Sequence, residues 1–338
     1  MKPLHTLTPM LLLLLAACQG KSDDAYQLRG QLTGMTSGEL YVYADNGLST
    51  RFDTLLIKDG KFAYAGHADQ VLPLHIFFPN ALEQVVFAGP GEELTYEAAA
   101  NDLANFRVKG SAENERMNRF REATAKQDTA TVRRTAAAYI LEDPASPVAI
   151  HLLLRYFLAP DAPPSAQRQA LLDTLLICQP DNRLLHLAQT RLDAAARTSV
   201  GDTLPALAVP LHQAGDTLRL GPGTTGRPLL IAFWASWMPR NWELLTTLRE
   251  LQRDYDGRLD ILAISLDTQR YQWENHLEQD SLALHHACDG CAWTSPYVEP
   301  FAISRLPAYV LADSGAVIRQ RSQGNTADLK AQVAALMQ

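Results

Sequence analysis

Cysteine is scarce in this sequence, with four residues among 338, and long hydrophobic runs and basic clusters are missing. A chain of this length has room for two or three domains, which excludes a disulfide-stapled miniprotein. Hydrophobic residues make up 47% and charged residues 20%, which excludes a disordered chain and a protein with many membrane spans. The 30 basic and 37 acidic residues give a net charge of -7, and the basic residues are scattered. We therefore expect no nucleic-acid partner.

The first eighteen residues have the three parts of a secretory signal. Lys2 supplies the charged region, residues 10–17 form an apolar run too short to cross a bilayer, and Cys18 follows small residues. The segment Leu15-Ala16-Ala17-Cys18 resembles the lipobox of bacterial lipoproteins. This resemblance implies a lipoprotein signal peptide over residues 1–18 and lipid attachment at Cys18. The alternative is an ordinary secretory signal with an incidental cysteine.

Residues 19–25 form a short polar tether. In the lipoproteins that this segment resembles, Gln19 in place of Asp removes the usual signal for retention in the inner membrane, so we expect an outer-membrane anchor. The acidic pair Asp23-Asp24 resembles the surface-export signals of Bacteroidota lipoproteins, although acidic residues in a tether also serve only solvation. The sequence leaves open whether the protein faces the periplasm or the cell surface.

Residues 26–110 have the pattern of an all-β domain. Short runs of alternating, β-branched and aromatic residues fall at residues 39–43, 52–57, 61–64, 74–78 and 84–87. Between them lie turn sequences such as Lys58-Asp59-Gly60, which fit hairpins because Gly adopts a positive φ at little cost. We expect a β-sandwich-like N-terminal domain.

Residues 111–199 are rich in Ala, Leu and Arg, with breaks that contain proline. This pattern predicts a helical linker region of three or four helices, and it carries no chemical motif. Cys178 ends an apolar helical stretch. We expect it to be buried, because a free cysteine behaves as a small hydrophobic residue.

Residues 200–338 alternate between buried strands and amphipathic helices. Continuous apolar runs predict strands at residues 229–234 and 259–266, buried on both faces of a parallel sheet. Helices are predicted around residues 244–251, 271–279 and 329–336, and further strands at residues 282–286, 308–312 and 317–318. The alternation predicts a three-layer α/β domain, so the whole chain is an α+β multidomain protein.

A specific motif lies at the end of the first buried strand of this domain. Phe233-Trp234-Ala235-Ser236-Trp237 leads into a strand-to-helix turn, and Leu306-Pro307 opens a later strand. Over residues 200–338 the chain resembles the thioredoxin-like lipoproteins of Bacteroidota, whose C-terminal domain is of the TlpA or thiol-disulfide interchange type behind an uncharacterised β-rich domain. The resemblance implies a thioredoxin-like fold with Cys-x-x-Cys directly after the aromatic motif. There, unpaired N–H groups at a helix start stabilise the first thiolate.

The two cysteine positions of that motif hold Met238 and Asn241. A thioether has no proton to lose and an amide is no nucleophile at neutral pH, so thiol exchange at this turn is excluded. We expect the turn to keep an apolar groove that holds an extended peptide. The groove residues would be Trp234, Trp237, Met238, Trp242 and a cis Pro307. The alternative is that these aromatic side chains only pack and cover the core.

A cysteine pair lies outside the motif, in His285-His286-Ala287-Cys288-Asp289-Gly290-Cys291. If the strand ends near His286, its carboxyl end points to the same sheet edge as the Met238 turn, where open α/β sheets place their sites. The favoured interpretation is a structural disulfide in an oxidising compartment. A relocated redox pair and a metal site for Cu(I) or Zn are the alternatives. Because His285 and His286 face opposite sides of a strand, only one of them would join the metal.

The sequence thus predicts an outer-membrane lipoprotein of the cell envelope with a redox-degenerate thioredoxin-like domain. Its expected role is binding or assembly, with an extended peptide or an envelope protein as the partner. The alternative is a thiol-disulfide oxidoreductase that uses Cys288 and Cys291. We expect no metal and no cofactor.

Overall fold

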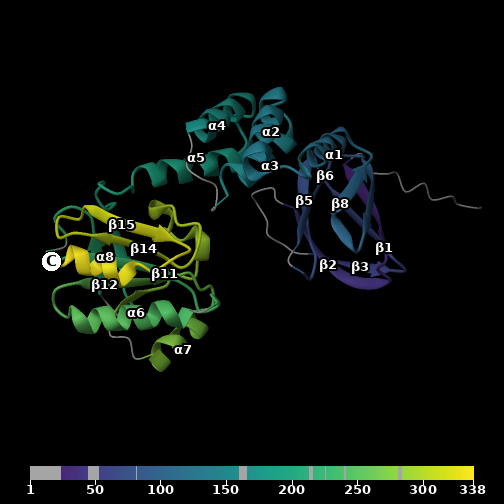
Figure 1. Cartoon of the computed structure of the whole chain (residues 1–338). Helices are drawn as coiled ribbons and strands as arrows, with labels where there is room; N and C mark the ends of the chain where they lie inside the picture. Colours follow the sequence, from purple (N-terminus) through teal and green to yellow (C-terminus); the bar gives the residue numbers. More distant parts are fainter. Residues whose placement is uncertain are drawn as a thin grey trace, which may run out of the picture. The chain divides into compact units, whose positions relative to one another are not determined.

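The computed structural model describes residues 24–44, 53–80, 82–159, 166–212, 216–224, 226–239, 241–280 and 284–338. The predicted signal peptide, with Cys18, lies outside these residues. The chain divides into two compact units, Met1–Tyr156 and Phe157–Gln338. The division falls inside the predicted helical region, so each unit contains part of it (Figure 1). In the described part of the chain, no helix is both long and apolar enough to span a bilayer.

Eight strands form one sheet in the first unit, where a sandwich-like domain was expected. Their order is β6-β5-β2-β3-β4-β1-β7-β8, and only the β1–β7 pair is parallel. The strands are β1 (Ala25–Thr33), β2 (Ser37–Ala44), β3 (Asp53–Lys58), β4 (Lys61–His67), β5 (Leu72–Phe77), β6 (Glu83–Ala88), β7 (Glu93–Ala99) and β8 (Asp102–Lys109). Strands β1, β7 and β8 have no counterpart among the predicted runs.

The sheet buries alternate side chains in one continuous core. On β1 the glycine at position 30 makes room for a partner, because Phe62 lies opposite it in register and a Cβ at Gly30 would lie 2.0 Å from the Phe62 ring. The predicted hairpin turn between β3 and β4 is confirmed, with φ of 51° at Asp59 and 73° at Gly60. These positive φ values are why the turn uses Asp and Gly.

Three helices complete the first unit: α1 (Ala112–Thr124), α2 (Thr129–Glu142) and α3 (Pro147–Tyr156). The Ser111 side chain caps α1 by accepting from the Asn114 N–H. Helix α1 contacts both β6 and β8, the two edge strands of the sheet.

The second unit begins with α4 (Ala166–Cys178) and α5 (Arg183–Ala196). The prediction that Cys178 is buried is wrong, since this thiol is exposed and free. Leu171, Leu172 and Leu175 form the buried stripe of α4. Cys178 is the last residue of α4. Both Cys178 and Ile177, which is 81% exposed, lie beyond the residues of this helix that pack against the core.

A five-stranded sheet of order β13-β12-β11-β14-β15 forms the centre of the second unit. Strands β11 (Leu229–Trp234), β12 (Asp260–Ser265) and β13 (His285–Ala287) are parallel, and β14 (Ala308–Ala312) and β15 (Ile318–Gln323) are antiparallel additions. Helices α6 (Asn241–Asp254), α7 (Arg270–Asp280) and α8 (Leu329–Leu336) lie where helices were predicted. A hairpin of β9 (Leu207–Pro210) and β10 (Thr217–Leu220) was not predicted.

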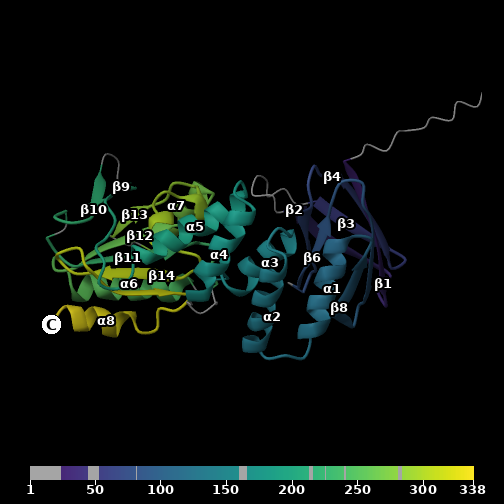
Figure 2. The same ribbon diagram turned by 90° about the horizontal axis from the view of Figure 1, so that it is seen from above.

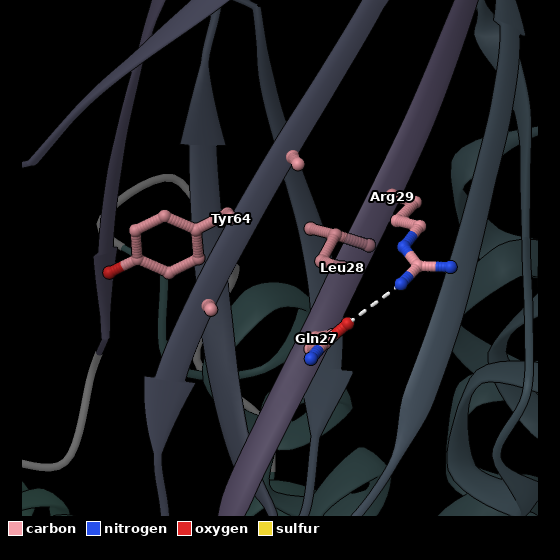
Figure 3. Close-up of a pocket in the computed structure, with 6 residues that line it drawn as sticks. Gln27, Leu28, Arg29 and Tyr64 are labelled. Carbon is pink, nitrogen blue, oxygen red and sulfur yellow. Dashed lines mark hydrogen bonds between the residues drawn. The ribbon is translucent and has the colours of Figure 1, made fainter. Parts of the chain in front are cut away.

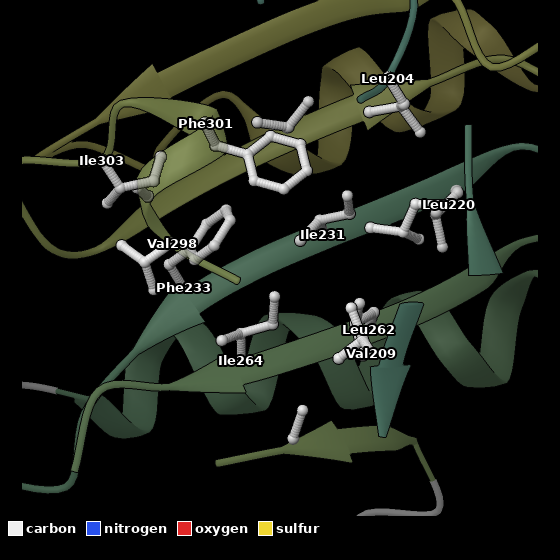
Figure 4. Packing of buried hydrophobic residues seen from close by; sticks show 14 of the residues in the cluster. Leu204, Val209, Leu220, Ile231, Phe233, Leu262, Ile264, Val298, Phe301 and Ile303 are labelled. Atoms are coloured by element: carbon white, nitrogen blue, oxygen red, sulfur yellow. The ribbon is translucent and has the colours of Figure 1, made fainter. Parts of the chain in front are cut away.

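The two faces of this sheet are covered differently. Apolar residues of α6 and α8, together with Trp273 of α7, pack on one face, and α6 and α8 run along the same side in Figure 2. The buried side chains on the other face include Val209 and Leu220 of the hairpin and Phe301 of a short 3-10 helix (Figure 4). The three-layer prediction implies a layer of helices on each face of the sheet. On this face, the hairpin and the 3-10 segment pack in that place.

Candidate functional site

The turn after β11 occupies the position where the resemblance places the catalytic cysteines. The Met238 N–H donates to the Ala235 carbonyl at 3.2 Å, and the Asn241 N–H donates to the Met238 carbonyl at 3.3 Å. Helix α6 begins at Asn241, so Met238 lies just before the helix and not within its first turn. Met238 is buried, and neither its thioether nor the Asn241 amide can exchange a disulfide.

The Asn241 side chain fixes the turn. Its Nδ2 lies 3.0 Å from the Ser236 carbonyl oxygen and 2.9 Å from His276 Nε2. The His276 ring stacks on Trp234, with centroids 6.1 Å apart and planes inclined by 7°. Trp234 is fully buried against α6, which corrects its prediction as a groove residue. Successive strand residues face opposite sides of the sheet, and Trp234 points into the core on the helical side.

A hollow of about 450 Å³ lies beside the turn. Its lining includes Met238 and Pro307, two of the predicted groove residues, together with the first turns of α6 and the segment 324–327. The Leu306–Pro307 peptide bond is cis, as predicted. Trp237 and Trp242 are 55% and 61% exposed, and they do not belong to the lining. The hollow therefore shares with the predicted groove only Met238 and Pro307.

A buried carboxylate that the sequence analysis missed joins the segments at this edge of the sheet. Asp267 follows β12 and is 1% exposed. Its carboxylate accepts from the Ser236 N–H at 2.9 Å, from the Ser236 hydroxyl at 2.6 Å and from the Ser265 hydroxyl at 2.6 Å. The signal available in the sequence was the pair of polar residues at the carboxyl end of a buried strand, where α/β sheets place their sites.

The cysteine pair follows β13. Both cysteines are free thiols: Cys291 is exposed, and Cys288 is half-buried. Cys288 Sγ donates to the Asp267 carbonyl at 3.4 Å, and Cys291 Sγ faces the Asp289 carbonyl at 3.7 Å. Burial raises the pKa of the Cys288 thiol; hydrogen bonds from Gly290 and Ser265 partly offset this rise, and the nearby Asp267 and Asp289 add to it. The predicted structural disulfide is not formed in this structure and stays a prediction.

The neighbouring histidines are arranged as the strand pattern predicts. His285 pairs in register with Leu262 and His286 with Ala263, and these two partners belong to the cores on opposite faces of the sheet. Across the ranges that the structure describes, no group of three or more His, Cys, Asp or Glu residues is placed to hold a metal ion. Nothing in the geometry therefore supports the metal alternative for the pair.

A smaller hollow of about 140 Å³ lies in the first unit, at the β1–β4 pair. Figure 3 shows its lining by Gln27, Leu28, Arg29 and Tyr64, with the Arg29 guanidinium donating to the Gln27 side chain at 3.0 Å. Its Arg29 side chain is exposed, and no cysteine, serine or histidine lines it. The candidate site therefore lies in the second unit.

Residues 26–117 match a family described as a domain of unknown function, DUF4369. None of the curated proteins matches the chain.

Solved structures similar to part of the chain include thiol-disulfide oxidoreductases from Bacteroides. A thiol-disulfide oxidoreductase from Bacteroides fragilis is 27% identical, with 40% of this chain and 99% of that chain covered and a TM-score of 0.35. The thioredoxin domain of a thiol-disulfide oxidoreductase from Bacteroides vulgatus is 18% identical, with 41% and 99% covered and a TM-score of 0.37. A thiol:disulfide interchange protein from Bacteroides sp. is 19% identical, with 42% and 91% covered and a TM-score of 0.35.

Proposed function

We propose that residues 200–338 form a thioredoxin-like domain that exchanges thiols and disulfides through Cys288 and Cys291. The observation that carries this proposal is the placement of two free thiols, separated by two residues, directly after β13, with Cys288 in contact with the Asp267 carbonyl. The turn at Met238 lies at the same edge of the sheet but has no thiol. Exchange in this domain therefore depends on the pair after β13.

The different exposure of the two thiols assigns their roles. Cys291 is exposed and is the thiol that a substrate disulfide can reach, so its thiolate attacks and forms a mixed disulfide, and one substrate thiol leaves. Cys288 is half-buried with a raised pKa, which suits a resolving thiol that reacts only when the mixed disulfide lies beside it. It then loses its proton and attacks Cys291 Sγ. Two electrons pass to the substrate, which leaves as two thiols.

The experiment measures reduction of a protein disulfide, such as that of insulin, by the mature chain carrying Cys178→Ser. That variant removes the exposed third thiol and serves as the matched control. Activity should persist in it and disappear when Cys288→Ser and Cys291→Ser are added. With Cys288→Ser alone, Cys291 should be trapped in a mixed disulfide with the substrate.

The reduction potential separates exchange from a structural disulfide. A working pair should lie well above about -300 mV, whereas a structural disulfide lies below that value. Activity that survives in the double serine variant, or a potential below this value, would contradict thiol exchange at this pair. Stoichiometric metal that is lost in the double variant would support the metal alternative instead.

A second candidate function, binding or assembly, is favoured by the hollow beside Met238 and Pro307. A reduced and carboxymethylated polypeptide is a suitable probe, because it offers extended chain without any disulfide. Binding that weakens when Ala327→Trp fills the hollow would support this role. Equal binding by the variant would contradict it.

The localisation proposal is an outer-membrane lipoprotein anchored through a lipid on Cys18. It rests on the signal sequence alone, because Cys18 lies outside the described residues.

A further inference from the structure

Asp267 lies between the cysteine pair and the Met238 turn, and it contacts them through different groups. Its main-chain oxygen accepts from Cys288 Sγ at 3.4 Å. Its carboxylate accepts from the N–H and the hydroxyl of Ser236, at 2.9 and 2.6 Å. A movement of the Asp267 backbone therefore changes the position of the group that holds Ser236.

We propose that Asp267 is a positioning residue that couples the oxidation state of Cys288 and Cys291 to the conformation of the Met238 turn, and thereby to the hollow at Pro307. The proposal rests on the proposed thiol exchange as the source of oxidation. The coupling itself can be tested separately, since a chemical oxidant also forms the disulfide.

Oxidation changes what Asp267 contacts. In the reduced protein the two sulfurs face different carbonyl oxygens, those of Asp267 and Asp289. When the pair reduces a substrate disulfide, both thiols lose their protons, one S–S bond forms, and two electrons and two protons convert the substrate disulfide into two thiols. A disulfide needs its sulfurs about 2 Å apart, and the two thiols are not bonded in this structure, so at least one sulfur must move when the bond forms. The S–H donor to the Asp267 oxygen disappears in any case.

The change reaches the turn through hydrogen bonds that involve a buried charge, which are among the stronger ones in proteins. Ser236 is held by the Asp267 carboxylate, and the Ser236 carbonyl oxygen in turn accepts from Asn241 Nδ2 at 3.0 Å. Met238 lies between these two anchors and lines the hollow. Trp237, in the middle of this turn, is more than half exposed, so its side chain does not anchor the turn in the core.

Hydrogen exchange measured by mass spectrometry tests the coupling in the mature chain carrying Cys178→Ser. The protein is compared in the reduced state and after oxidation with diamide, with the Cys288–Cys291 disulfide verified by peptide mapping. We expect the amides of Ser236, Met238 and Asn241, whose hydrogen bonds hold the turn, to exchange about tenfold faster in the oxidised protein. The amides of α4, which none of these contacts involves, should not change.

Variants assign the effect to Asp267. Asp267→Asn should abolish the difference between the two states, and Ser236→Ala, a milder change on the other side of the contact, should reduce it. Asp289→Asn is the matched control, because Asp289 faces Cys291 and not the turn, and it should keep the full difference.

The outcomes distinguish the coupling from the thiol exchange. Equal exchange rates in both states of the parent protein, or a full difference in either Asp267→Asn or Ser236→Ala, would overturn the coupling. An absent response together with active insulin reduction would leave the proposed function in place. Failure of diamide to form the Cys288–Cys291 disulfide would overturn both proposals.

Discussion

Asn114 and Asn118, four residues apart on α1, each pair with the main chain of a different edge strand of the N-terminal sheet. Asn114 accepts from the Phe87 N–H on β6 at 3.0 Å and donates to the Phe87 carbonyl at 2.6 Å. Asn118 does the same with Val108 on β8, at 3.2 and 2.6 Å. At one residue of each edge strand, the asparagine amide makes the two main-chain hydrogen bonds that a neighbouring strand would otherwise make. A single helix therefore covers both edges of the sheet, whose main-chain groups would otherwise be unpaired.

Replacing either amide should destabilise the first unit. Asn114→Leu or Asn118→Leu leaves a buried N–H and carbonyl without partners, and an unpaired buried group costs about 1–3 kcal/mol. We expect a loss of at least about 2 kcal/mol in the free energy of unfolding. Urea unfolding should be followed by circular dichroism, because all five tryptophans lie in the second unit. Arg119→Ala, at an exposed position of the same helix, is the control, and an equal effect there would refute the edge-pairing role.

The first unit should lose stability in acid because of His151. Burial, together with the nearby His75, lowers the pKa of His151 from 6.5 to about 4. The hydrogen bond from His75 likewise lowers the pKa of Glu83. Both groups bind fewer protons in the folded unit than in the unfolded chain. The stabilisation is therefore complete above pH 6.5 and is lost as the pH falls toward 4.

The size of this effect follows from the His151 shift, which corresponds to at most about 3 kcal/mol. Urea unfolding between pH 7.5 and 4, followed by circular dichroism, should show this decline in the free energy of unfolding. His151→Leu keeps an apolar side chain beside Phe87 and should flatten the decline. An unchanged pH dependence in the variant would show that another group is responsible.

A dithiol rebuilt at the Met238 turn should react. Met238→Cys with Asn241→Cys, made in a chain that lacks Cys178, Cys288 and Cys291, restores the spacing that the resemblance implies. Because position 238 lies just before the start of α6, unpaired N–H groups there should lower the thiol pKa below its usual value of about 8.5. Alkylation rates as a function of pH measure this pKa, and insulin reduction measures exchange. An ordinary pKa without exchange would mean that these positions are not those of the lost cysteines.

Membrane attachment should depend on Cys18. Cys18→Ser removes the predicted site of lipid attachment, so the protein should be released from membranes or remain unprocessed. Fractionation of cells that express each form measures this. A variant that still sediments with the outer membrane would refute the anchor. Proteinase treatment of intact cells carrying the unchanged protein would then show which side of the membrane it faces.

Local sequence pattern determined much of the fold. The continuous apolar run at residues 229–234 predicted β11 at its observed bounds, and the stripe that begins at Leu244 predicted α6, because a buried strand and an amphipathic helix each impose their own period. The replacement of both cysteines by Met238 and Asn241 could also be seen from the sequence alone. So could the hairpin at Asp59-Gly60, since a positive φ favours these residue types.

The tertiary structure alone decided which of these residues meet. Asp267 holds Ser236 from 31 positions away, and Asn114 reaches Phe87 from 27 positions away. It also buried Trp234 while leaving Cys178 exposed, although both belong to apolar stretches. Local periodicity records which residues are apolar and how they repeat. It does not record which distant polar group will accept from a buried donor. Nor does it record how far along a helix or strand the neighbouring elements pack, because both depend on how the elements come together in space.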